Sequence, residues 1–121
     1  MAGSSRYAFY GSLRRGLQNH EPYKSHLRYQ FSCWIKGFQL YSLGDFPFAW
    51  KTGIESDKIL VEVFEIDNLQ VEEQINQLEK GYGYIDDTIL IDEKPAKIYL
   101  FKDKANYPIV LEGDWLKFFR A

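Results

Sequence analysis

Hydrophobic residues occur along this chain in short segments separated by glycines and prolines, a pattern that favours strands over helices. The segments predicted to be strands cover residues 7–10, 33–43, 59–66, 88–91 and 96–102, with a break expected at Gly37 in the second. Several are apolar on both faces, as in residues 61–64. Because such a strand must be covered on both sides, we expect a closed or covered sheet rather than a hairpin open to water.

One helix is well marked between Asp67 and Gly81. The Asp67 carboxylate can cap the first turn while Gln70 reaches back toward it, a variant of the capping box. Apolar side chains recur one and two turns apart and give the helix one buried stripe: Val71, Ile75 and Leu78. Gly81 supplies the C-terminal stop. A second, weaker helix is expected over residues 21–29.

Composition adds three constraints. The 121 residues include 15 Lys and Arg and 17 Asp and Glu, a formal net charge of −2, which argues against nucleic-acid partners and a polybasic membrane anchor. Aromatic residues make up 17% of the chain, which suits a small β-rich core and leaves tyrosine hydroxyls to line a polar cavity. Cys33 is the only cysteine, and no apolar run reaches the length of about eighteen residues that suggests a membrane span. We therefore expect a single domain over residues 1–121 in a reducing, cytoplasmic compartment.

Familiar catalytic motifs are absent from the sequence. It contains no Gly-x-Ser-x-Gly elbow, Walker loop, Cys-x-x-Cys pair or His-Glu-x-x-His motif. We interpret His20 and His26, the only histidines, as packing or surface residues rather than metal ligands. Cys33 lies beside Trp34 in an aromatic strand, where a buried, unreactive thiol is expected. An enzyme built from this chain would not depend on a nucleophile activated by histidine.

The loop of residues 10–13, Tyr-Gly-Ser-Leu, directly follows the first predicted strand. A glycine there lets consecutive backbone amides point into one concavity, which can bind a carboxylate or a phosphate. Arg14 and Arg15 add positive potential, and the lack of a Gly-Lys-Ser/Thr ending disfavours phosphate. The alternative is an ordinary turn with two surface arginines.

Glu79 is the candidate for proton transfer. It projects on the same side of the helix as Ile75 and belongs to the last turn before Gly81. The exposed carbonyls of a helix end and partial burial both disfavour a carboxylate, so the pKa of Glu79 should rise. The alternative is a boundary glutamate that reaches water beside Lys80.

Three further features carry weaker signals. Neighbouring carboxylates at residues 86–87 and 92–93 point to opposite faces if they lie on strands, so we interpret them as solvated positions. Residues 113–115, Gly-Asp-Trp, predict a turn followed by a docked aromatic side chain. The later tyrosines fit either core packing or a cavity wall: Tyr82, Tyr84 and Tyr99.

Together these segments resemble the gamma-glutamyl cyclotransferase-like family, including its gamma-glutamylamine branch. The residues that carry the resemblance follow the family's order over most of the chain: 7–16 with Asn19-His20, 40–47, 61–66, 78–82 with Tyr84, Tyr99, and 113–115. The Tyr-Gly-Ser-Leu loop becomes a strong signal when a helix-ending glutamate follows much later in the chain. Relatives commonly carry Tyr-x-Arg after that glutamate, whereas this chain has Asp86 at the matching position.

The resemblance implies an α+β fold, a small mixed β-barrel flanked by short helices. It also implies an enzyme that splits a gamma-glutamyl amine or peptide through the substrate's own α-amine, releasing 5-oxoproline and a free amine without a cofactor or metal. Glu79 would be the general acid and base, and the substrate site would comprise Tyr10, Gly11, Ser12, Leu13, Tyr84 and Tyr99. The alternative is a non-catalytic protein of the same fold that binds a small carboxylate or gamma-glutamyl metabolite. A third interpretation is a structural or partner-binding barrel that uses exposed aromatic residues.

Overall fold

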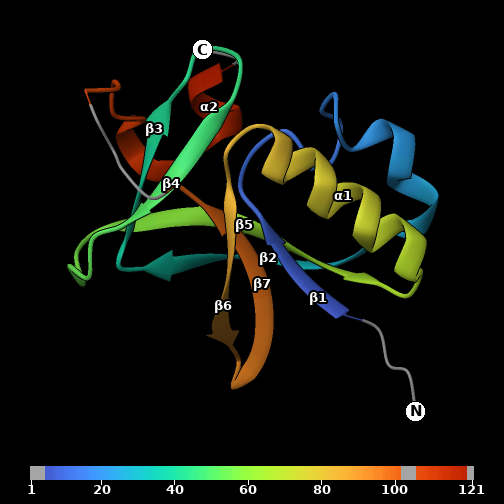
Figure 1. The fold of residues 1–121 in the computed structure, drawn as a ribbon. Helices are drawn as coiled ribbons and strands as arrows, with labels where there is room; N and C mark the ends of the chain where they lie inside the picture. Colours follow the sequence, from blue (N-terminus) through green and yellow to red (C-terminus); the bar gives the residue numbers. More distant parts are fainter. Residues whose placement is uncertain (1–4, 102–105, 120–121) are drawn as a thin grey trace.

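A computed structural model describes residues 5–101 and 106–119 of the chain (Figure 1). The larger of its two sheets contains β1 (Ser5–Phe9), β2 (Arg28–Lys36), β5 (Lys58–Ile66), β6 (Ile85–Ile91) and β7 (Lys94–Leu100), in the order β2-β5-β1-β7-β6. The smaller sheet is an antiparallel hairpin of β3 (Phe38–Ser42) and β4 (Pro47–Lys51). The helical segments are the 3-10 helices η1 (Glu21–His26) and η2 (Leu111–Gly113) and the α-helices α1 (Leu69–Gly81) and α2 (Trp115–Phe119).

The larger sheet is covered on both faces around β1. This strand pairs antiparallel with β5 and parallel with β7. Because side chains alternate along a strand, Tyr7 and Phe9 enter one hydrophobic core with α1, whereas Ala8 and Tyr10 enter a second core with Trp115 of α2. Figure 1 shows α1 on one side of the sheet, and the β3–β4 hairpin with α2 on the other. The apolar pattern on both faces of the predicted strands therefore reflects a covered sheet.

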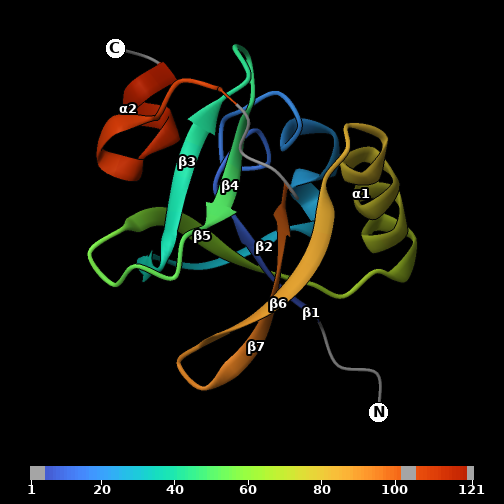
Figure 2. The same cartoon turned by 60° about the vertical axis from the view of Figure 1, so that its left-hand side comes forward.

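The α+β class is confirmed, but no closed β-barrel is found among the described residues, where the larger sheet ends at β2 and β6. Gly37, with a φ of 87° that suits glycine, separates β2 from β3 and redirects the chain into its own hairpin. This hairpin covers the sheet and approaches the end of β7, where Phe101 N donates a hydrogen bond to Ala49 O (3.3 Å). In Figure 2 the β6–β7 hairpin projects away from the rest of the sheet.

The predicted central helix is confirmed as α1, but its N-cap differs from the prediction. Asn68 caps the helix, and its Oδ1 accepts a hydrogen bond from the backbone N–H three residues later (3.1 Å). The Asp67 carboxylate instead pairs with Arg28 at 2.8 Å. The helix ends at Gly81 as predicted, and Gly83 takes the left-handed conformation (φ 92°) that turns the chain toward β6.

Two other segments differ from the predicted elements. Residues 21–29 do not form one helix, because Leu27 is extended after η1 and the chain then enters β2. Strand β4 is missing from the prediction, since its short sequence begins with a proline, which is typical of a turn or strand edge. No helix in the ranges that the structure describes has the length and apolar character needed to cross a bilayer.

The β6–β7 hairpin is longer than the sequence predicts. Strand β6 begins at Ile85 rather than Thr88, and its first carboxylates are exposed, in agreement with their interpretation as solvated positions. Asp92 and Glu93 form its two-residue turn with positive φ values of 52° and 65°, as a tight hairpin requires. The predicted strand 96–102 extends to Lys102, which lies outside the described residues.

Gly113 provides a stability test of this arrangement, with Gly53 as its control. Both residues have positive φ (68° and 72°), but a Cβ atom at Gly113 would lie 2.3 Å from Lys58 O, whereas one at Gly53 would meet nothing within 4 Å. We predict that Gly53→Ala lowers the free energy of unfolding by about 1–2 kcal/mol, the cost of a left-handed L-residue. Gly113→Ala should lower it by more than about 3 kcal/mol, because strain and a backbone clash combine. Urea unfolding measures both, and equal losses would contradict the close approach.

Candidate functional site

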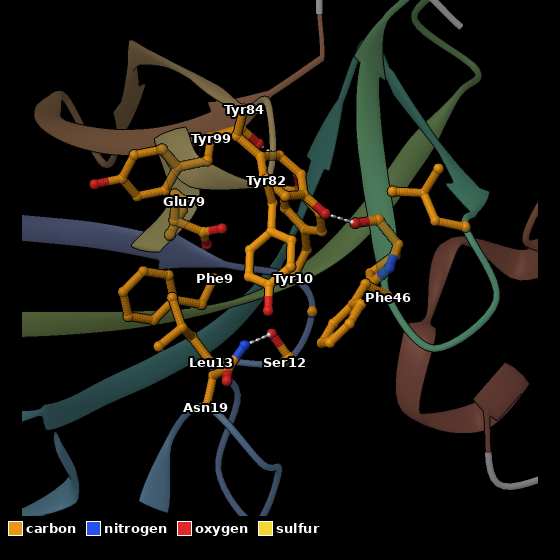
Figure 3. Close-up of a pocket in the computed structure, with 14 residues that line it drawn as sticks. Phe9, Tyr10, Ser12, Leu13, Asn19, Phe46, Glu79, Tyr82, Tyr84 and Tyr99 are labelled. Carbon is orange, nitrogen blue, oxygen red and sulfur yellow. Dashed lines mark hydrogen bonds between the residues drawn. The ribbon is translucent and has the colours of Figure 1, made fainter. Parts of the chain in front are cut away.

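All seven predicted site residues line one pocket between the loop after β1 and the end of α1: Tyr10, Gly11, Ser12, Leu13, Glu79, Tyr84 and Tyr99. Figure 3 shows the Glu79 carboxyl group on one side, with Ser12, Leu13 and Asn19 on the opposite side. The pocket has an empty volume of about 540 Å³, part of which is open to solvent.

The Glu79 carboxyl group is the electrostatic centre of this pocket. Among the described residues that line the pocket, Glu79 is the only one with a charged side chain. Burial raises its pKa to about 7, because desolvation penalises the carboxylate more than the neutral acid. The predicted rise is therefore confirmed, with burial as its cause. A carboxyl group with this pKa can both accept and donate a proton near neutral pH.

The loop of residues 10–13 is shaped by close contact and by hydrogen bonds from Asn19. A Cβ atom at Gly11 would lie 2.7 Å from Pro47 Cγ, so glycine is required here for close approach rather than for a left-handed turn. Asn19 N donates to Ser12 O (3.1 Å), and Asn19 Nδ2 donates to Ser12 Oγ (2.7 Å). Within the described part of the chain, no group accepts a hydrogen bond from the backbone amides of Ser12 and Leu13. These amides are available for an anionic ligand.

The three tyrosines of the predicted site use their hydroxyl groups to hold the pocket wall together. Tyr10 donates to the Tyr99 carbonyl and accepts a hydrogen bond from Ala49 N (3.1 Å), so it joins β7 to β4. Tyr84 donates to the Pro47 carbonyl, and Tyr99 donates to Asn76 Oδ1 (3.3 Å). Burial raises the pKa of all three hydroxyls, and the Glu79 carboxylate acts in the same direction. These tyrosines therefore remain neutral and shape the cavity.

Sequence reasoning missed part of the lining. Seven further residues line the pocket, and all of them belong to segments that carried the family resemblance without being assigned to the site: Ala8, Phe9, Asn19, Leu43, Phe46, Pro47 and Tyr82. For Tyr82 the sequence allowed either core packing or a cavity wall, and the structure places it at the cavity, 54% exposed.

The structure shows the ion pairs of two charged residues near the pocket, Arg14 and Asp86. Arg14 is not a surface arginine, because it is buried and paired with Glu62 (3.1 Å). Asp86, at the position where relatives commonly carry arginine, does not line the pocket and pairs with Lys97 at 3.6 Å and Lys80 at 4.0 Å. Its negative charge is therefore balanced on the exposed strand β6.

The histidines and the cysteine are not grouped into a metal site. His20 is buried with its Nδ1 2.8 Å from Leu13 O, and His26 is exposed. Cys33 is half-buried, and burial raises the pKa of its thiol, which disfavours the reactive thiolate. Across residues 5–101 and 106–119, no three His, Cys, Asp or Glu side chains are arranged to hold a metal ion.

Comparison with known proteins assigns the chain to a family. Residues 7–117 match the model of the family described as gamma-glutamyl cyclotransferase, AIG2-like, and the chain belongs to that family. Membership supports a cyclotransferase-type enzyme in general. No curated protein sequence matches the chain significantly.

Solved structures share this fold. An uncharacterized protein from Pyrococcus horikoshii is 31% identical with a TM-score of 0.82, and the match covers 97% of this chain and 94% of that one. The protein ytfP from Escherichia coli is 28% identical with a TM-score of 0.71 over 92% and 96% of the two chains. An AIG2-like protein from Mus musculus shares the fold, with 20% identity and a TM-score of 0.69 over 88% and 86%.

The raised pKa of Glu79 predicts a pH-dependent stability. The folded protein keeps this group protonated up to about pH 7, whereas the unfolded chain ionises it near pH 4.5, so folding loses stability as the pH rises between these values. We predict that Glu79→Gln unfolds with nearly wild-type free energy at pH 4 and is about 2 kcal/mol more stable than wild type at pH 8. Urea unfolding of both proteins across this range measures the difference. A difference that does not change with pH would contradict the buried carboxyl group.

Proposed function

We propose that this protein is a gamma-glutamyl cyclotransferase that cleaves a gamma-glutamyl amine or peptide and releases 5-oxoproline and a free amine. The observation that carries this proposal is the pairing, in one pocket, of a half-buried Glu79 with the backbone of residues 10–13. Family membership supports the reaction type. The proposed reaction needs a group that binds the substrate's carboxylate and a group that transfers a proton, and in this proposal the backbone amides of residues 10–13 and the Glu79 carboxyl group take these roles.

The proposed reaction uses a nucleophile that belongs to the substrate. The α-amine attacks the γ-carbonyl carbon, the new C–N bond closes the five-membered ring, and the bond to the leaving nitrogen breaks. Glu79 takes a proton from the attacking amine and returns one to the leaving nitrogen, so no net proton or water is consumed. Holding an intramolecular nucleophile in position can be worth about 7–11 kcal/mol at best. This explains why no serine or cysteine nucleophile is needed.

The loop amides and the tyrosine wall support the substrate pose. In this proposal the backbone of Gly11, Ser12 and Leu13 binds the α-carboxylate, which places the neighbouring α-amine toward Glu79. Tyr84 and Tyr99 line the wall and keep water away from the reacting atoms. A substrate held in this way must fold back on itself, which is the geometry that ring closure requires.

Release of 5-oxoproline from gamma-glutamyl amines tests the proposal. Glu79→Gln keeps the size of the side chain but removes proton transfer, and we predict a loss of kcat of about 10²–10⁴-fold. Glu73→Gln on the exposed face of the same helix is the matched control and should retain wild-type kcat. Equal activity of Glu79→Gln and wild type would remove Glu79 from the mechanism. Stabilisation by 5-oxoproline without any product over long incubation would favour the non-catalytic binding protein instead.

A further inference from the structure

The open side of the pocket is aromatic. Phe46, from the turn between β3 and β4, and Tyr82, the residue after α1, have ring centroids 5.5 Å apart. Both line the pocket, and Tyr82 is 54% exposed, so this pair lies where the pocket meets solvent. Leu43 and Pro47 extend the apolar surface beside them.

The charge of the pocket lining limits the chemistry of the leaving group. None of the described lining residues carries a positive charge, and Glu79 is acidic. A leaving group with its own carboxylate, such as an amino acid, would therefore find no cationic partner. An uncharged aromatic or alkyl group would bury its surface against the two rings.

Building on the proposed function, we infer that Phe46 and Tyr82 form a subsite for the leaving amine and select an apolar one that carries no carboxylate. The glutamyl half of the substrate occupies the inner pocket between residues 10–13 and Glu79, and the leaving group extends along the two rings. This assigns specificity to two residues outside the proton-transfer machinery.

Two substrates test the subsite: gamma-glutamylphenethylamine and gamma-glutamylphenylalanine, which share the phenyl ring and its two-carbon linker and differ only in the carboxylate of the leaving group. We expect kcat/KM to favour the phenethylamine substrate by about tenfold or more. Because both substrates carry the ring, Phe46→Ala and Tyr82→Ala should each lower kcat/KM for both substrates at least threefold, as expected for lost ring contacts of about 0.5–1.5 kcal/mol. Trp34→Ala, which removes an exposed aromatic side chain outside the pocket lining, is the control and should leave kcat/KM unchanged.

The outcomes separate the subsite from the reaction. Equal kcat/KM values for the two substrates, or wild-type kcat/KM values in both pocket variants, would overturn the subsite while leaving the cyclotransferase intact. Absence of 5-oxoproline from both substrates would overturn the proposed function and the subsite with it.

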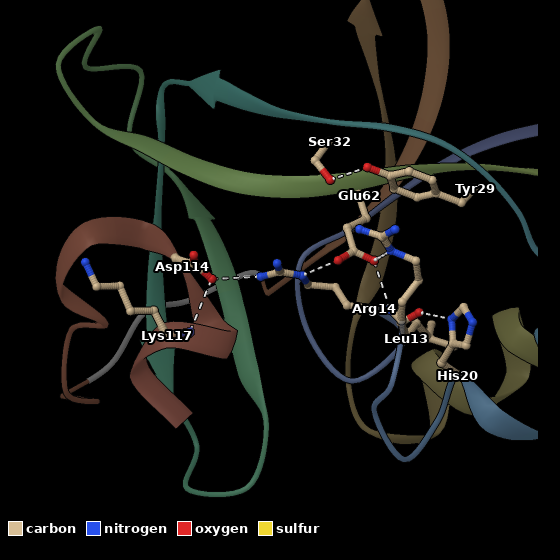
Figure 4. Close-up of polar contacts among 9 residues, drawn as sticks. Leu13, Arg14, His20, Tyr29, Ser32, Glu62, Asp114 and Lys117 are labelled. Carbon is tan, nitrogen blue, oxygen red and sulfur yellow. Dashed lines mark hydrogen bonds and ion pairs between the residues drawn. The ribbon is translucent and has the colours of Figure 1, made fainter. Parts of the chain in front are cut away.

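A second inference rests on buried charges behind the pocket loop. Arg14 directly follows Leu13, and Figure 4 shows its guanidinium group between Glu62 and Asp114. Arg14 Nε donates to Glu62 Oε2 (3.1 Å), and Arg14 Nη1 donates to Asp114 Oδ1 (3.0 Å). Arg14 is 4% exposed and Glu62 is 2% exposed, so the charges depend on one another for solvation. Glu62 also accepts a hydrogen bond from Arg15 N (2.9 Å).

Asp114 is held in place by the residues on either side of it. Gly113 lies so close to Lys58 O that no side chain fits there, and Trp115 is 1% exposed in the core. The Gly-Asp-Trp segment therefore presents Asp114 to Arg14 in a fixed position. Its hydrogen bond with Arg14 connects this C-terminal segment to the loop of residues 10–13.

We propose that Asp114 is a positioning residue, which fixes the carboxylate-binding loop through Arg14. The part of this inference that concerns substrate binding rests on the proposed function, whereas the part that concerns loop rigidity does not. The fixed loop keeps its amides pre-arranged for an anion, so that ligand binding does not have to order them.

Asp114→Asn tests this role, with Glu55→Gln at an exposed ion pair as the control. We expect amide hydrogen exchange in residues 10–15 to accelerate at least fivefold. KM for the gamma-glutamyl substrate should rise about tenfold, while kcat and its pH profile stay close to wild type, because Glu79 is not altered. Arg14→Lys keeps the charge but not the two-sided contact and should show the same KM effect.

The two measurements test separate parts of this inference: hydrogen exchange tests the rigidity of the loop, and KM tests its role in substrate binding. Wild-type hydrogen exchange in Asp114→Asn would overturn the rigid connection, whatever the enzyme does. Faster exchange with an unchanged KM would overturn the role in substrate binding. If wild type released no 5-oxoproline, the proposed function and the substrate-binding role would fail, while hydrogen exchange would still decide the structural part.

Discussion

The structure depends on one constraint: a carboxyl group is kept partly out of water at the end of α1, facing the loop that leaves β1. Ionisation of Glu79 costs desolvation free energy. The described residues of the surrounding wall are tyrosines and backbone rather than cations, so no positive charge offsets that cost. A cation in this pocket would stabilise the carboxylate and lower its pKa. The composition of the wall therefore decides the protonation of the central group.

The tyrosine hydroxyls explain how a small protein keeps such a cavity open. Tyr10 links β7 and β4, and Tyr84 links the start of β6 to Pro47. Each ring buries apolar area at one end and satisfies a backbone group at the other, so the β3–β4 hairpin is attached to the larger sheet without continuous strand pairing. The pocket lies in the space that this attachment leaves.

Local features could be predicted from the sequence, and contacts between distant segments could not. The position of α1 and two residues of its predicted buried stripe, Val71 and Ile75, follow from their spacing, whereas the third, Leu78, is only half-buried. The meeting of Glu79 with residues 10–13 followed from the family resemblance, because hydrophobic periodicity contains no information on how separate elements approach. The burial of Arg14 could not be predicted, since its partners lie 48 and 100 positions away in the sequence. The sequence also does not show that Asn68 rather than Asp67 is the N-cap, because both side chains suit that position.

A crystal structure of the protein with 5-oxoproline bound tests the central claim most directly. The expected complex has the ligand carboxylate within hydrogen-bond distance of the backbone amides of Ser12 and Leu13, and the lactam nitrogen beside the Glu79 carboxyl group. A ligand bound elsewhere, or a Glu79 side chain turned into solvent with the pocket occupied, would contradict the assignment of this pocket as the site of ring closure.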